Sequence, residues 1–362
     1  MRFSDPLDSW LMYYNSCEEL EDEGAQLEAV RRSLDGVDHR LANTPAGKKP
    51  DYFGHGLGLN RRAYGLIRLP PADLERIQEL YGRIQQRGGS GMMDICQILL
   101  DLTAMSADPI SVPFWEQSFD KQLPRAKIAG KRRQYALAAL ALLVITGNEK
   151  AAWEPLLRAL SHSKPESRML AAYYLRRICE QTGRPLSWAA QEKLERLAGS
   201  ERSLDPRFMA RRTLAATGNV LPPEVPDGSY AFKVWHSLDE TAHRVIEIAS
   251  LQTLDHLHQA IQQAWDWDAD HLYAFYPGNR LHDPRFEFGH DYMDDVLYYA
   301  IETRIGDLGL RRRNRMLYWF DFGDNHVFVA EVVAVKPVAE SGQLPRVVEA
   351  VGETLSQYER HI

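Results

Sequence analysis

The feature that most constrains the fold of this 362-residue chain is a short helical motif that occurs three times. The motif is Arg-x-x-Ala-x-x-x-Leu, and its copies begin at Arg133, Arg168 and Arg207, at spacings of 35 and 39 residues. The alanine lets two helices approach closely, and the leucine four residues later lies on the same helix face. A recurrence at this period predicts stacked helical pairs.

The residues that flank each copy fit a helical pair. A glycine follows each motif, where it would supply the left-handed cap at the end of a helix. Pro165 and Pro206 stand where a first helical turn would begin. The segment 92–220 therefore resembles HEAT-type repeats, a resemblance that implies an all-α repeat array. An irregular helical bundle is the alternative.

In either arrangement the motif alanines Ala136, Ala171 and Ala210 should be buried. The motif arginines are expected to be exposed or to stack on neighbours, rather than to bind phosphate. The sequence of residues 1–91 predicts further helices around a long loop. The glycine-rich stretch 54–58 in that loop is not a phosphate loop, because no strand precedes it and no Gly-Lys-Ser/Thr follows.

A proline-rich linker at 221–229 separates this array from a domain of a different kind, predicted over 230–362. Apolar residues alternate at 230–235 and 243–248, which predicts strands. A helix follows Thr253, a third strand lies at 272–276, and a hairpin is expected over 316–336. We also expect a second helix at 291–303. This order predicts an α+β fold of β-grasp-like layout.

Several separated motifs in this domain occur in the order typical of one family. They are 259–275 with its Trp-Asp-Trp and His-Leu-Tyr-Ala-Phe segments, 305–308, 318–324 and 345–349. Residues 230–353 are thereby similar to the plasmid pRiA4b ORF-3-like family. The resemblance implies a protein of plasmids and mobile genetic elements and implies no particular reaction.

The chain also departs from the family pattern. His326 and Phe328 stand where the family has Trp and His, and residues 351–358 replace a cysteine-containing tail. A metal or ligand site built from that tail would be missing in this chain.

Charge is distributed unevenly along the chain, whose net charge is −7. From Val225 onward 22 acidic residues face 12 basic ones, a local balance of −10. This acidity disfavours nucleic-acid binding, which needs a basic face. The sequence contains no apolar run of the roughly 18 residues that span a bilayer and no secretory signal, so we expect no membrane partner and a cytoplasmic protein.

No catalytic or metal-binding signature is present. The histidines of the second half lie among acids, but none has the spacing of a zinc or iron site, so we expect no metal and no cofactor. His256 and His258, for example, are two residues apart on a predicted helix and face different ways. A hydrolase with a His/Asp site is the weakest of the alternatives.

The sequence instead favours a non-enzymatic interaction protein with a protein partner. Its candidate surface combines aromatic, acidic and histidine side chains, namely Trp265, Asp266, Asp270, His271, Asp321, Asp324 and His326. A nucleic-acid partner is the alternative, through the basic residues Arg311, Arg312, Arg313 and Arg315.

Overall fold

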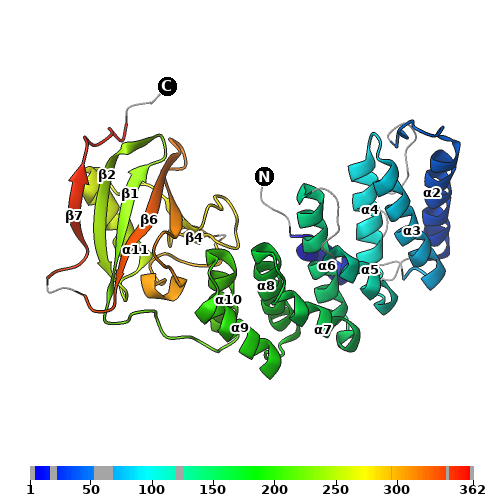
Figure 1. Cartoon of the computed structure of the whole chain (residues 1–362), viewed down its shortest axis with the longest axis horizontal. Coiled ribbons are helices and arrows are strands. Elements are labelled where there is room, and N and C mark those ends of the chain that lie inside the picture. The colour runs from blue at the N-terminus through cyan, green and yellow to red at the C-terminus, as the bar shows by residue number, and fades with distance from the viewer. Residues whose placement is uncertain are drawn as a thin grey trace. The chain divides into compact units, whose positions relative to one another are not determined.

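The computed structural model of the chain describes residues 5–16, 23–52, 68–119, 126–294, 296–339 and 342–358. The chain divides into two compact units, Ser4–Leu186 and Ser187–Ile362 (Figure 1). The glycine-rich stretch 54–58 lies outside the described residues.

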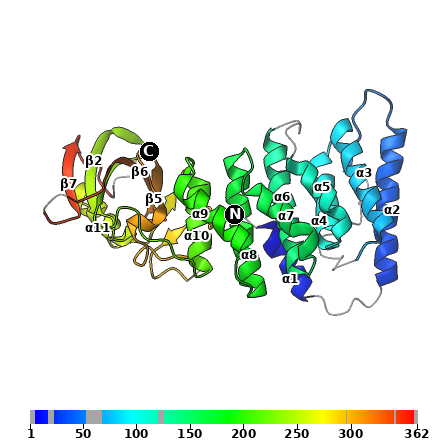
Figure 2. The same ribbon diagram turned by 60° about the horizontal axis from the view of Figure 1, so that its bottom comes forward.

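The first unit is all α-helical. Its helices are α1 (Pro6–Ser16), α2 (Glu23–Asn43), α3 (Pro71–Arg87), α4 (Met92–Met105), α5 (Val112–Glu116), α6 (Ala126–Ile145), α7 (Glu149–Ala159) and α8 (Pro165–Thr182), with 3-10 turns at Pro109–Ser111 and Gln117–Phe119. Helix α6 packs against α1, α5, α7 and α8 (Figure 2). Every residue from Ala136 to Val144 is buried, as expected of a central helix that is apolar all round.

The motif alanines behave as the repeat predicts. Ala136, Ala171 and Ala210 are fully buried, which confirms that these positions face helix contacts. Gly183 ends α8 in the left-handed conformation, with φ 66°, and the glycines after the other two motifs also have positive φ. The HEAT-like assignment itself stays a prediction.

The second unit opens with a helical pair, α9 (Trp188–Ser200) and α10 (Leu204–Ala216), and continues into a sheet. The sheet has the order β4-β3-β5-β6-β1-β2-β7, and all pairings are antiparallel. Its strands are β1 (Ser229–His236), β2 (Asp239–Ala249), β3 (Tyr273–Pro277), β4 (Phe288–Gly289), β5 (Arg315–Phe320), β6 (His326–Lys336) and β7 (Arg346–Val351). The predicted linker at 221–229 therefore lies inside this compact unit.

Helix α11 (Leu254–Trp265) packs on β2 and β7, α10 contacts β3, and a 3-10 turn lies at Ile305–Leu308. Thr253 caps α11 as predicted, in a capping box with His256. Helices and an antiparallel sheet confirm the α+β class, and the β-grasp-like layout stays a prediction.

The predicted helix at 291–303 is wrong. The described residues of this segment form turns, because part of their backbone is hydrogen-bonded to β4. Gly289 donates to the carbonyl of Tyr298 and accepts from the amide of Ala300. These bonds replace the i to i−4 bonds of a helix.

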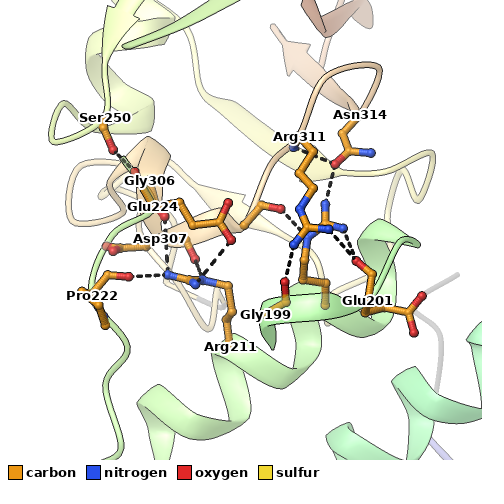
Figure 3. A network of polar contacts seen from close by, with 12 residues as sticks. Gly199, Glu201, Arg211, Pro222, Glu224, Ser250, Gly306, Asp307, Arg311 and Asn314 are labelled. Atoms are coloured by element: carbon orange, nitrogen blue, oxygen red, sulfur yellow. Dashed lines mark hydrogen bonds and ion pairs between the residues drawn. The ribbon is translucent and has the colours of Figure 1, made fainter. Parts of the chain in front are cut away.

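Two arginines of α10, Arg207 and Arg211, join the helical pair to the rest of the second unit. Figure 3 shows Arg211 among its partners. Arg207 is fully buried, and its guanidinium donates to the carbonyls of Gly309 (2.6 Å) and Glu201 (2.6 Å) and to the side chain of Asn314 (2.6 Å). Arg211 donates to the carbonyls of residues 222 and 307. The expectation that the motif arginines are exposed or stacked is therefore wrong for Arg207, because the planar guanidinium satisfies several backbone carbonyls at once.

Candidate binding surface

The turn after α11 displays the first acids of the candidate site. Asp266 ends the helix in the left-handed conformation, with φ 56°, and its side chain is exposed. The two tryptophans beside it point inward. Trp265 is 1% exposed and Trp267 is buried, with its Nε1 donating to the carbonyl of Leu355 at 2.7 Å. The prediction that Trp265 contributes to an exposed surface is thus wrong, because its side chain is buried in the core, as is that of Trp267.

The C-terminal tail fixes the backbone of this turn. The Gln357 side chain accepts from the Asp268 amide at 2.7 Å and donates to the Asp268 carbonyl at 3.2 Å. His326, which is buried against the Trp267 ring, places Nε2 3.0 Å from the Gln357 carbonyl oxygen. His326 is therefore a support of the surface and not an exposed contact residue.

The hairpin turn between β5 and β6 supplies the second part of the site. Asp321 is buried, and its Oδ1 accepts from the amides of Gly323 (3.0 Å) and Asp324 (3.3 Å). Its Oδ2 lies 3.5 Å from Nε2 of His271, which lies equally far from a carboxylate oxygen of Asp270. Asp321 thus connects the hairpin turn to the segment at 270–271 through its contacts with Gly323, Asp324 and His271.

Four exposed carboxylates result from this arrangement, and we call them the acidic surface: Asp266, Asp268, Asp270 and Asp324. Among the described residues no lysine or arginine forms an ion pair with any of them. The exposed Tyr358 places its hydroxyl 3.3 Å from Asp268. Partial desolvation and the charges of Asp270 and Asp268 raise the pKa of Tyr358. The surface is therefore strongly negative and carries an aromatic side chain.

The basic cluster at 311–315 is largely engaged within the unit. Arg311 donates to the carbonyls of Gly199 and Glu201 in the helical pair. Arg312 donates to a β6 carbonyl, and Arg315 lies 2.7 Å from the Glu331 carboxylate. Arg313 is exposed. A phosphate contact through Arg311 would therefore have to give up hydrogen bonds that the structure already makes.

A buried polar network under α11 was not apparent from the sequence. The Tyr318 hydroxyl lies 2.7 Å from Nδ1 of His258 and accepts from Gln262 at 2.6 Å, while the His258 ring stacks on Tyr273 at 3.9 Å. Burial lowers the pKa of His258 to about 4, so the ring is neutral at pH 7. A period-3.6 pattern that places His258 on the apolar face is the signal that could have revealed it. The network positions α11 on the sheet.

The described residues contain no group of three His, Cys, Asp or Glu side chains that could hold a metal ion. None of their helices has the length and apolar composition that crossing a bilayer requires.

The second unit is thus an α+β domain with a seven-stranded antiparallel sheet, the helices α9, α10 and α11 and a displayed acidic surface. Its residues 230–356 match the family described as plasmid pRiA4b ORF-3-like protein, so the chain contains a domain of this family. The chain is similar to a protein of unknown function from Methanosarcina mazei Go1 whose crystal structure is known. The two sequences are 22% identical over a match that covers 37% of this chain and 74% of that chain, with a TM-score of 0.32. No curated protein matches the chain.

Proposed function

We propose that the chain is a non-enzymatic interaction protein whose acidic surface binds a basic segment of a partner protein. The observation that carries this proposal is that four exposed carboxylates stand on fixed backbone without a lysine or arginine ion pair among the described residues. Exposed carboxylates without a strong cationic partner contribute little to folding, whereas they speed and orient the approach of a positively charged partner.

The rigidity of the surface supports the same conclusion. Gln357 holds the backbone of Asp268, and the buried carboxylate of Asp321 holds the hairpin turn that carries Asp324. Binding to a surface that is already ordered costs less conformational entropy than binding to mobile loops. Acids on a fixed scaffold therefore suit recognition better than they suit a solvated loop.

The nucleic-acid alternative has less support. The acidic surface repels phosphate, and Arg311 and Arg315 already bond to groups within the unit. The matched family is named after an open reading frame of a plasmid. Proteins of mobile genetic elements are therefore the first candidates for the partner.

The test compares affinity capture from the native host by three forms of the full chain. The double variant Asp270→Asn/Asp324→Asn removes two charges from the acidic surface. Asp227→Asn removes an exposed charge from the segment before β1 and serves as the matched control. Partner proteins identified by mass spectrometry should be retained by the wild type and the control and lost from the double variant, with about a tenfold weaker affinity for each 1.4 kcal/mol lost.

Equal capture by all three forms would exclude the acidic surface as the binding site. Capture of nucleic acid rather than protein, insensitive to the double variant, would favour the alternative function.

A further inference from the structure

The last strand of the sheet has features that the acidic surface does not explain. β7 lies at the end of the strand order and pairs with β2 alone (Figure 1). Among the described residues no other segment pairs with its outer edge. Val347, Val348 and Val351 are 44%, 50% and 40% exposed. Apolar side chains thus accompany an open row of backbone donors and acceptors.

Both ends of β7 are held firmly in place. Arg346 forms a fork with Glu247 of β2, through Nε at 3.2 Å and Nη2 at 2.7 Å. Glu247 is almost fully buried, and although burial alone would raise its pKa, hydrogen bonds from Ser229, Arg346 and Lys336 hold that pKa at about 2. At the other end Arg244 donates to the Val351 carbonyl at 2.8 Å. The edge is therefore a rigid template.

Proteins usually protect such an edge. Lysine or proline on the strand, or a loop across it, prevents the addition of another strand. β7 contains neither lysine nor proline, and its protective features are one exposed acid, Glu349, and a register shift opposite Val245 and Ile246. An apolar edge with so little protection is costly unless a partner covers it.

Charge decides which partner fits. The cation of β7, Arg346, is used by Glu247. The charges left at this edge are the exposed carboxylates of Glu349, which also lies 3.4 Å from His243 Nε2, and of Glu353. A second copy of this chain would bring two acidic domains and two such edges together, and like charges across paired strands are unfavourable. A strand with lysine or arginine among apolar residues complements the edge.

We propose that β7 binds an extended, basic and apolar segment of a partner protein, which adds a strand to the open edge of the sheet. Backbone hydrogen bonds supply affinity in this mode, and alternate side chains supply specificity. The site is separate from the acidic surface and does not depend on the function proposed for it.

The test measures binding of a defined peptide to the full chain. The probe is an acetylated, amidated octapeptide that alternates valine with lysine, and its two controls carry glutamate in place of lysine or N-methyl groups on alternate amides. Fluorescence anisotropy gives the affinity, and hydrogen exchange reports protection of residues 346–351. Val348→Lys adds a charge to the edge, while Val338→Lys makes the same change at an exposed valine outside the strands.

The lysine peptide should bind and slow exchange in β7, and both control peptides should bind at least about tenfold more weakly. Val348→Lys should weaken the lysine peptide by a similar factor, whereas Val338→Lys should not. The protection of residues 346–351 by the lysine peptide should be unchanged in Asp270→Asn/Asp324→Asn, because the acidic surface is a different site. The proposal is overturned by equal binding to Val348→Lys, by loss of that protection in the double variant, or by no binding at millimolar peptide. A dimer that Val348→Lys abolishes would overturn it in favour of a second copy.

Discussion

At the scale of single residues, the second unit depends on a histidine that must stay neutral. His258 is buried between the rings of Tyr273 and Tyr318 and bonds to the Tyr318 hydroxyl. Its pKa is about 4 in the folded chain, well below the roughly 6.5 of a histidine in an unfolded chain. The unfolded state therefore takes up a proton first as the pH falls.

We predict that acidification destabilises the second unit through His258. The stability that its neutral form contributes is present above about pH 6.5 and is lost as the pH falls toward 4. Between pH 7 and pH 5 the loss should be about 2 kcal/mol of unfolding free energy. Urea unfolding of the full chain, read by hydrogen exchange in α11, measures it. His258→Gln should show a shallower pH dependence, and an unchanged slope would contradict the assignment.

The candidate site shows what sequence reasoning can reach at this scale. The exposed acids Asp266, Asp270 and Asp324 were identified because turn residues are polar and lie at surfaces. The burial of Trp265 and His326 was missed because alternation predicts which residues share a face but not what covers that face. His326 is covered by the tail around Gln357, which is distant in sequence, and Trp265 packs against Phe328 and Arg244.

At the scale of elements, the helical pair α9–α10 is bonded to the domain that follows it. The buried guanidinium of Arg207 satisfies carbonyls of Glu201 and Gly309, which come from opposite sides of the contact. Burial and the nearby charge of Arg311 lower the pKa of Arg207 to about 10, which leaves it protonated at neutral pH. The arginine that begins the third copy of the motif therefore links the helical pair to the sheet domain.

We predict that Arg207→Lys loosens this contact. A single ammonium group cannot replace the planar fork, and buried carbonyls left without a donor cost about 2 kcal/mol or more in total. Limited proteolysis should become faster between residues 217 and 228, and hydrogen exchange in α10 should increase. Arg202 is exposed and lies between α9 and α10. Arg202→Lys is the control and should behave as wild type. Equal proteolysis of both variants would show that the network is dispensable.

The elements themselves were predicted unevenly, for physical reasons. The 3.6-residue and two-residue periods located α11, β1, β2 and the β5–β6 hairpin closely. The segment 291–303 has a helical composition, but its bonds to Gly289 override that local preference. β7 was missed because its exposed valines do not alternate with polar residues. Its position in the sheet depends on the hydrogen bonds between Arg346 and Glu247, which are distant in sequence.

At the scale of the whole molecule, the chain consists of two units that meet in sequence at Ser187, before the repeat pattern ends. The repeat groups α9 and α10 with the preceding helices because α10 carries the same motif as α6 and α8. The structure groups them with the sheet, because long-range bonds and not local pattern determine which elements fold together.

We predict that a fragment of residues 187–362 folds cooperatively on its own and that a fragment of residues 221–362 is much less stable. The shorter fragment lacks Arg207 and Arg211 and leaves the carbonyls that they satisfy without their donors. Circular dichroism during thermal unfolding measures both. A shorter fragment as stable as the longer one would show that the helical pair does not stabilise the domain.

The arginine network also limits how this domain could be exchanged between genes. The proline-rich stretch at 221–229 is a natural place for a crossover, yet a break there would separate Arg207 and Arg211 from the carbonyls of residues 307 and 309. A crossover near Ser187 would carry donors and acceptors together into the new gene. Fusions that keep this domain functional should therefore carry its two preceding helices as an inherited part of it.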